Sequence, residues 1–290
     1  MTFGVSSMAA PLHRVAVRRP GPSMVNADPS QWHYGPQFDP ACVAGQHDNF
    51  TACLADAGCE VIHMGNDDLG IADAVFAYDA SLVTLQGAVL MSPGKVLRQG
   101  EQETHRIFYE EVGIPIIGEV TGEARAEAGD TLWLDDHVLA VGLGFRTNAE
   151  GAGQIKQLLN DMGVEVRVFD LPYYQGKDAC LHLMSLVSIV DTRSALVCFE
   201  LVPVALQELM LDLGYHLIAA PFDEFQSTGT LSTNVLATAP GKCIMLDGIS
   251  KTRTALENAG IEVRVFDGDA LCVGCEGGPT CLTRPLLRHA

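Results

Sequence analysis

Acidic, imidazole and thiol side chains recur along the chain at intervals of about 50 residues. They are Asp79, then Glu127 with Asp130, then His182, and finally Cys281. A deprotonated cysteine is a strong nucleophile, a histidine moves protons, and carboxylates orient the histidine or hold a cation. If the fold brings these groups together, their types predict covalent catalysis by a cysteine thiolate.

Each of these residues also has a purely structural interpretation. Asp79 and Asp130 could satisfy backbone donors in turns. His182 is flanked by leucines, where a hydrogen-bonded core histidine is common. Cys281 follows Gly-Gly-Pro-Thr, a turn whose backbone can approach a ligand closely but which could equally have no chemical role. Their occurrence at matching positions of successive repeats favours the functional interpretation.

The repeats are marked by a small or apolar residue, a glycine and an alternating apolar run. The five glycines are Gly58, Gly113, Gly163, Gly214 and Gly260, separated by 55, 50, 51 and 46 residues. A fixed period near 50 residues is typical of repeat or propeller-like architectures. Equivalent positions of the five units should therefore face one central axis.

Each glycine follows a predicted amphipathic helix and precedes a strand. The helix over residues 204–213 has Leu206, Leu209, Met210 and Leu213 on one face, at the spacing of an α-helix. The glycine ends the helix in the left-handed conformation.

Two more strands are expected after each of these strands. The sequence thus predicts a closed α/β ring of five pseudo-symmetric ββαβ units around a central cavity, in one domain over residues 1–290. The expected strand pairs are 80–84 with 88–92, 131–134 with 138–142, 183–190 with 195–199, and 231–237 with 243–246, while 286–288 and 13–18 complete the fifth unit.

The composition limits the classes of partner. The chain has 290 residues, 48% of them hydrophobic, and a formal net charge of −18. Nucleic acid requires a basic surface, so we expect no nucleic-acid partner. The acidity is compatible with a cationic small-molecule substrate, although solubility explains it equally well.

Nine cysteines without a regular framework indicate free thiols in a reducing compartment. Cys198 and Cys243 are expected to be buried small apolar residues. The N-terminal sequence does not resemble a signal peptide, and no apolar stretch is long enough to span a membrane. We therefore expect a soluble cytoplasmic protein without a membrane partner, and the sequence leaves a homo-oligomer open.

The motifs resemble those of the guanidino-group-modifying enzymes, or penteins, over nearly the whole chain. The segment from Gly277 to Cys281 and the following Leu-Thr-Arg-Pro-Leu resemble the nucleophile motif of that superfamily. Glu127-Ala-Gly-Asp130 is similar to its Glu-Gly-Gly-Asp segment. The resemblance implies the pentein α/β propeller fold.

Within the superfamily, the dimethylarginine dimethylaminohydrolase branch is the most similar. The matching stretches run from Asp73 to Asp79, from Ser92 to Glu101, from Gly144 to Asn148 and from Leu181 to Ser185. Arginine deiminases and amidinotransferases tend to carry an aspartate two residues after the histidine, where this chain has Met184. Tyr78 also replaces an acid that often precedes the aspartate of the branch.

The resemblance implies a mechanism without a cofactor or metal. Cys281 would attack the guanidinium carbon and form an S-alkylthiouronium intermediate. His182 would protonate the departing amine and then deprotonate water, with Glu127 orienting the imidazole. Asp79 and Asp73 would bind guanidinium nitrogens, and Arg98 and Arg146 the α-carboxylate. The substrate-binding set implied is Asp73, Phe76, Asp79, Arg98, Asp130 and Arg146.

The implied reaction is hydrolysis of a guanidino amino acid, with dimethylarginine giving citrulline and dimethylamine as the first choice. Deimination of arginine or another guanidino acid, or amidino transfer to an amine, are the alternatives. Two segments could cover the substrate: the loop over residues 170–178 and the stretch over residues 20–38.

Two other hypotheses do not involve guanidino-group chemistry. Cys272 and Cys275 have Cys-x-x-Cys spacing and could form a zinc site with Cys281 and His289, or Cys275 could form a disulfide with Cys281. Alternatively, the protein could bind a cationic amino acid without catalysis. The joint presence of Cys281, His182 and Glu127 favours an enzyme.

Overall fold

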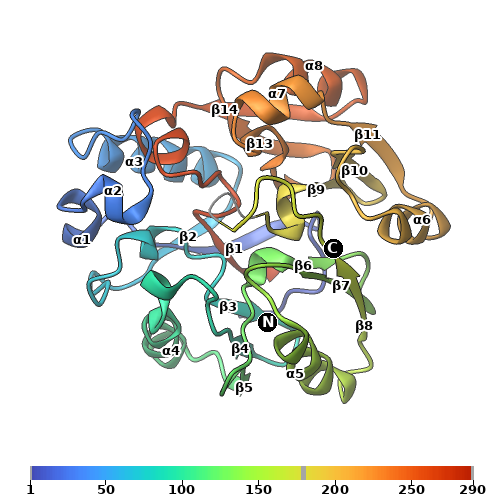
Figure 1. Cartoon of the computed structure of the whole chain (residues 1–290), viewed down its shortest axis with the longest axis horizontal. Coiled ribbons are helices and arrows are strands. Elements are labelled where there is room, and N and C mark those ends of the chain that lie inside the picture. The colour runs from blue at the N-terminus through green and yellow to red at the C-terminus, as the bar shows by residue number, and fades with distance from the viewer. Residues whose placement is uncertain (1, 178–180, 289–290) are drawn as a thin grey trace.

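Five three-stranded sheets surround a common axis in the computed structural model, which describes residues 2–177 and 181–288 (Figure 1). In chain order the strands are β1 (Leu12–Val17), β2 (Glu60–His63), β3 (Ser81–Val83), β4 (Ala88–Leu90), β5 (Ile116–Glu119), β6 (Thr131–Trp133), β7 (Val138–Leu143), β8 (Glu165–Asp170), β9 (Val187–Asp191), β10 (Ser194–Val197), β11 (His216–Ala219), β12 (Leu236–Ala239), β13 (Lys242–Leu246), β14 (Glu262–Phe266) and β15 (Arg284–Arg288).

All five sheets share one pattern of pairing. The first and second strands are antiparallel, and the second and third are parallel, as in β3-β4-β5 and β6-β7-β8. A parallel pair needs a crossover, and a helix provides it in every unit. The five crossover helices lie at the outside of the ring in Figure 1: α3 (Val43–Asp56), α4 (Glu101–Val112), α5 (Ala149–Asn160), α6 (Val204–Asp212) and α8 (Ser250–Asn258). The ββαβ prediction is therefore confirmed.

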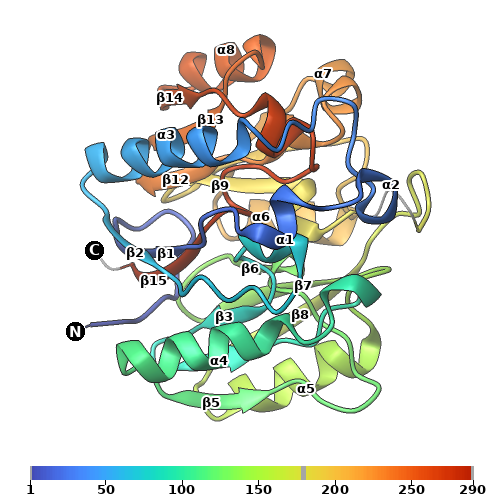
Figure 2. The ribbon, with the colours of Figure 1, turned by 90° about the vertical axis from the view of Figure 1, so that its left-hand side faces the viewer.

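The ring closes between the two ends of the chain. Strand β15 pairs antiparallel with β1, and β1 pairs in parallel with β2, so that β15 lies beside β1 in Figure 2. Buried Arg288 donates to the carbonyl groups of Ala10 and Ala237. The fifth unit is thus assembled from the first and last strands.

The five repeat glycines end their helices as expected. Their φ angles are 88°, 71°, 71°, 81° and 84° from Gly58 to Gly260, in the left-handed region that a residue with a Cβ rarely adopts. In α6, Leu206 and Met210 are fully buried. The predicted helical face therefore packs on the sheets.

Two predicted strands begin later than the sequence indicated. The segments 183–190 and 231–237 each open with a 3₁₀ turn, η4 (Leu183–Ser185) and η5 (Leu231–Thr233), before β9 and β12. Apolar periodicity cannot distinguish a buried turn from a buried strand. Similar turns precede the other first strands, among them η1 (Ala72–Val75) and η3 (Ala128–Asp130).

The remaining elements connect these units. They are α1 (Pro22–Val25), α2 (Pro29–Trp32), α7 (Phe222–Ser227), the 3₁₀ turn η2 (Val96–Arg98) and the π-helical turn η6 (Asp269–Val273). Within residues 2–177 and 181–288, no helix has the length and apolar character needed to cross a bilayer.

Candidate active site

A cavity of about 400 Å³ collects residues from all five units, a size in the range of small-molecule sites. Cys281 and His182 line this cavity, and so do five of the six expected substrate-binding residues. These five are Asp73, Phe76, Asp79, Arg98 and Arg146. Glu127 and Asp130 are fully buried behind the wall.

Short 3₁₀ turns direct the side chains into the cavity. Glu127 is the residue that precedes η3, and His182 precedes η4, while Phe76 follows η1. The backbone amide of His182 donates to Ser185 Oγ at 3.2 Å. Because each turn leads into the first strand of its unit, the turn fixes where the residue beside it points.

The turn that carries Cys281 is packed too tightly for side chains at its two glycines. A Cβ on Gly277 would lie 2.3 Å from the ring of Phe76, and one on Gly278 would lie 2.5 Å from Cγ of Asn234. Asn234 Nδ2 in turn donates to Cys281 Sγ at 3.1 Å. The Gly-Gly pair therefore lets Phe76 and Asn234 close around the turn that carries Cys281.

Asn234 was not among the residues expected from the sequence. The fourth unit had supplied no acid, histidine or cysteine at the matching position, and Asn234 lies immediately after η5. A polar residue at the end of a turn that matches those of the other units was the only available signal.

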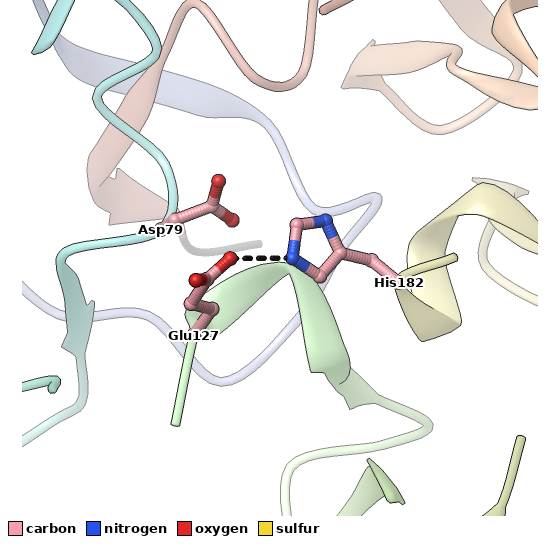
Figure 3. Close-up of side chains that lie close together, drawn as sticks. All are labelled: Asp79, Glu127 and His182. Carbon is pink, nitrogen blue, oxygen red and sulfur yellow. Dashed lines mark hydrogen bonds and ion pairs between the residues drawn. The ribbon is translucent and has the colours of Figure 1, made fainter. Parts of the chain in front are cut away.

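His182 and Glu127 form a tight pair, shown with Asp79 in Figure 3. His182 Nε2 lies 2.7 Å from Glu127 Oε2, and Arg146 Nη1 donates to the same oxygen at 2.9 Å. The backbone amides of Gly94 and Lys95 donate to Glu127 Oε1 at 2.8 and 3.2 Å. The carboxylate is thus held by four groups, and its bond to Nε2 fixes the orientation of the imidazole.

The charges around this pair favour an ionised carboxylate and a protonated imidazole. Burial alone would raise the pKa of Glu127, but Arg146 and the hydrogen bond from His182 hold it below the usual range. Burial opposes protonation of His182, yet Asp79 and the bond to Glu127 raise its pKa to about 9. His182 is therefore a proton donor at neutral pH.

Cys281 has the opposite tendency, because its surroundings favour the neutral thiol. Burial, followed by the negative charge of Asp79, raises the pKa of its thiol to about 11. The hydrogen bond from Asn234 and the positive charge of Arg98 act against this rise. A bound cation would favour the thiolate further, because an opposite charge nearby stabilises the ionised form.

The position of Arg98 differs from its expected role as a ligand of the substrate carboxylate. Its guanidinium is buried and donates to Glu101 through Nε and Nη2, to Asp79 through Nη1 at 2.6 Å, and to the carbonyl of Phe76. Most of its donors are therefore already used. Arg98 instead fixes the Asp79 carboxylate, whose other oxygen accepts from Gly129 N at 3.0 Å.

Asp73 is likewise engaged within the protein. Lys95 Nζ lies 2.6 Å from Asp73 Oδ2, and the Tyr34 hydroxyl donates to Oδ1 at 2.9 Å. Lys95 also lies 5.4 Å from the centroid of the Trp32 ring. Of the two expected guanidinium-binding acids, Asp79 is the one beside the turn that carries Cys281, since Tyr78 N donates to the carbonyl of Cys281.

Asp130 does not line the cavity and instead supports the turn that carries His182. Its Oδ1 accepts from Leu183 N at 2.9 Å. Burial raises its pKa to about 6. The expectation that Asp130 contacts substrate is thus not matched by its position.

Tyr78 and Met184 do not line the cavity. The Tyr78 ring packs under the Arg284 guanidinium at 4.1 Å, and Met184 lines a separate small void with Tyr78 and Met8. Neither position presents a second acid to a ligand.

The structure describes three of the four side chains of the zinc hypothesis, those of Cys272, Cys275 and Cys281. Cys272 is buried and Cys275 lines the cavity with Cys281, while His289 lies outside the described residues, as do Asp178 and Cys180. Across residues 2–177 and 181–288, the one group of three side chains close enough to hold a metal is Asp79, Glu127 and His182, within 4.8 Å of one another. Arg98 and Arg146 already neutralise these carboxylates, which favours an acid–base role.

Gly129 makes a close approach that can be tested. A Cβ there would lie 2.7 Å from Asp79 Oδ1 and 2.8 Å from His182 Nδ1. We expect Gly129→Ala to displace both groups and to lower kcat/KM by about 100-fold, since small misplacements of catalytic groups have effects of this size. In Gly153→Ala, within α5, the added Cβ meets nothing within 4 Å, so this control should keep full activity. Equal kinetics for the two variants would contradict the packing argument.

Known proteins match this chain at the level of sequence and fold. Residues 70–216, just over half of the chain, match the family model of arginine deiminase. The arginine deiminase of Mycobacterium avium is 30% identical over 57% of this chain and 47% of its own length; the chain thus spans about half the length of these relatives. An uncharacterised Bacillus subtilis protein, YkgA, is 27% identical over 84% of this chain and 79% of its own.

Solved structures share the fold. Dimethylarginine dimethylaminohydrolase from Pseudomonas aeruginosa, as a Cys→Ser mutant complexed with citrulline, has a TM-score of 0.78 and 23% identity, over 96% of this chain and 100% of the other. The amidinotransferase SxtG from Microseira wollei has a TM-score of 0.80 and 16% identity, over 100% and 98%. The N-terminal domain of ArgZ, a cyanobacterial arginine dihydrolase, has a TM-score of 0.77 and 19% identity, over 95% and 97%.

Proposed function

Because the chain belongs to the arginine deiminase family of the pentein superfamily, we propose that it hydrolyses a C–N bond of a small guanidino compound through a covalent cysteine intermediate. The observation that carries this proposal is the convergence of Cys281, His182 and Asp79 on one cavity, with Glu127 bonded to His182. The other resemblance-based assignments, a single domain over residues 1–290 and a small-molecule partner, belong to the same proposal.

In the proposed reaction, the Cys281 thiolate attacks the guanidinium carbon and a C–S bond forms. The C–N bond to the leaving amine then breaks, and His182 supplies the proton that the amine takes away. Water next attacks the thiouronium carbon and gives a proton to His182 as the C–S bond breaks. The products are a ureido compound and an amine, and both Cys281 and His182 return to their starting states.

Asp79 is the proposed guanidinium ligand. Arg98 and Gly129 hold its carboxylate in place, so that a cation can bind without first ordering a mobile side chain. The bound cation would also favour the Cys281 thiolate. Arg146, which lines the cavity beside Glu127, is the remaining candidate among the expected ligands of a substrate carboxylate.

We further propose that the guanidine is substituted, with dimethylarginine as the first choice. Of the acids that line the cavity, Asp79 is beside the Cys281 turn, whereas Asp73 is paired with Lys95. The position two residues after His182 is the apolar Met184, turned into another void. A dialkylated nitrogen has no N–H to donate, so it needs no second carboxylate. Deimination of arginine itself is the second candidate, favoured by the match to the arginine deiminase family.

Product analysis tests these alternatives. Purified protein is offered dimethylarginine, monomethylarginine, arginine and other guanidino acids separately, with Cys281→Ser protein as the blank. Release of citrulline and dimethylamine from dimethylarginine supports the first choice of substrate. Release of ammonia from arginine supports the arginine deiminase alternative instead. If no guanidino compound gives a product, the proposed function is wrong.

The pH dependence of the reaction should have an alkaline optimum. The reactive form pairs a Cys281 thiolate with a protonated His182, whereas their pKa values of about 11 and about 9 favour the reverse arrangement. The profile of kcat/KM, which reports the free enzyme, should therefore rise up to about pH 9, peak near about 10 and fall above about 11. The kcat profile should peak at lower pH, because the bound cation lowers the thiol pKa. Identical profiles for kcat and kcat/KM would contradict the role given to the substrate cation.

A further inference from the structure

The fourth unit also contributes to the nucleophile. Asn234 lines the cavity and follows η5, as Phe76 follows η1, whereas Glu127 and His182 precede their turns. Its Nδ2 donates to Cys281 Sγ at 3.1 Å, and its Oδ1 accepts from Thr280 N at 3.0 Å. One amide thus bridges the sulfur of Cys281 and the backbone immediately before it.

The backbone of the turn before Cys281 leaves the space that the Asn234 amide occupies. Gly278 leaves the space that Asn234 fills, because a Cβ there would lie 2.5–2.7 Å from three Asn234 atoms. The amide cannot rotate without losing the bond to Thr280, so the orientation that presents Nδ2 to sulfur is fixed. A fixed donor costs little reorganisation when charge develops on its acceptor.

We propose that Asn234 is a catalytic residue of the fourth unit, whose side-chain amide holds Cys281 Sγ in position and stabilises its thiolate by donating a hydrogen bond. This inference rests on the proposed role of Cys281 as the nucleophile. A hydrogen bond to an ionised acceptor is stronger than one to a neutral acceptor, so the bond gains strength as the thiol loses its proton. The same donor would lose that strength once sulfur is bonded to the guanidinium carbon.

The other charged and titratable groups around Sγ have different effects. Asp79 acts against the thiolate and Arg98 favours it, while His182 lines the same cavity and Cys272 is a neighbouring thiol. Arg98 is committed to Asp79 and Glu101. The neutral groups that favour the thiolate by direct contact are therefore the Asn234 side chain and the backbone amide of Gly278, and Asn234 is the one of the two that acts through a side chain.

The test uses alkylation of Cys281 by iodoacetamide and needs no substrate. The rate is followed from pH 7 to about pH 12.5, past the thiol pKa of about 11, by mass mapping of the Cys281 peptide. In Asn234→Ala the midpoint of the profile should rise by about one pH unit, and the rate below the midpoint should fall about threefold, because a more basic thiolate is also a stronger nucleophile. Asn234→Asp, which keeps the shape but places a carboxylate beside sulfur, should raise the midpoint further.

Two more variants separate this effect from a loss of structure. Gly278→Ala should displace the amide and raise the midpoint as Asn234→Ala does, while Asn258→Ala, at the exposed end of α8, should leave the profile unchanged. Wild-type midpoints in folded Asn234→Ala and Asn234→Asp would overturn the inference, and so would a uniform change of rate without a shifted midpoint. If the midpoint shifts in the Asn234 variants but the wild-type protein hydrolyses no guanidino compound, the inference is supported and the proposed function is contradicted.

Discussion

Replacing Cys281 by serine is expected to lower turnover of the guanidino substrate by at least about 10⁴-fold, since loss of a nucleophile has effects of this order. A serine hydroxyl stays protonated across the accessible pH range, and near neutral pH the cavity offers it no neutral imidazole, because the pKa of His182 is raised to about 9. The fold should be unaffected, since Asn234 can donate to a hydroxyl oxygen as it does to Sγ. Ligand affinity should therefore remain within a few-fold of wild type.

Steady-state kinetics and calorimetric binding of the same ligand measure the two effects separately. Cys42→Ser is the matched control, because that thiol is exposed and bonds only locally to Asp39. Cys275→Ser distinguishes the two thiols of the cavity. Lost activity in Cys275→Ser together with retained activity in Cys281→Ser would move the nucleophile to Cys275.

Glu127→Gln is expected to lower kcat by roughly 10³-fold, the scale seen when the group that orients a catalytic imidazole is neutralised. Glu127 carries the negative charge that compensates both His182 and Arg146. Without that charge the protonated imidazole is less stable, so the pKa of His182 falls. Once the bound cation has lowered the thiol pKa below that of His182, loss of the imidazole proton sets the alkaline limb of the kcat profile. That limb should then move to lower pH in Glu127→Gln, because the proton donor is lost earlier as pH rises.

The matched control is Glu123→Gln, an exposed residue four positions earlier in the same loop, which should behave as wild type. Thermal unfolding of Glu127→Gln must be measured alongside the kinetics, since the substitution leaves Arg146 without its carboxylate. A folded Glu127→Gln protein with kcat within threefold of wild type and an unmoved alkaline limb would show that Glu127 does not govern His182.

The repeat pattern could be predicted from the sequence because its determinants are local. A helix, a glycine of positive φ and an apolar strand occupy adjacent residues, and the same three features return in every unit. The convergence of Asp79, Glu127, His182 and Cys281 followed from that symmetry. The late starts of β9 and β12 did not, because the turns η4 and η5 are as apolar as the strands they precede.

The hydrogen-bond partners of the site residues could not be predicted from the repeat pattern. Arg98 has the residue type of a carboxylate ligand, but the nearness of Asp79 and Glu101 commits its donors. Asn234 lacks the acid–base chemistry that identified the other residues, and its contact with Cys281 joins positions 47 residues apart. Such pairings depend on how units meet across the axis rather than on the pattern within one unit.

The closure of the ring by β15 and β1 sets the order in which the site is completed during synthesis. Cys281 lies directly before β15, which pairs with β1 some 270 positions earlier in the chain. During synthesis, Asp79, Glu127 and His182 leave the ribosome well before Cys281. One edge of β1 stays unpaired until residues 284–288 emerge. Of these four side chains, the thiol of Cys281 is thus the last to be synthesised, and the pairing of β15 with β1 completes the cavity around it.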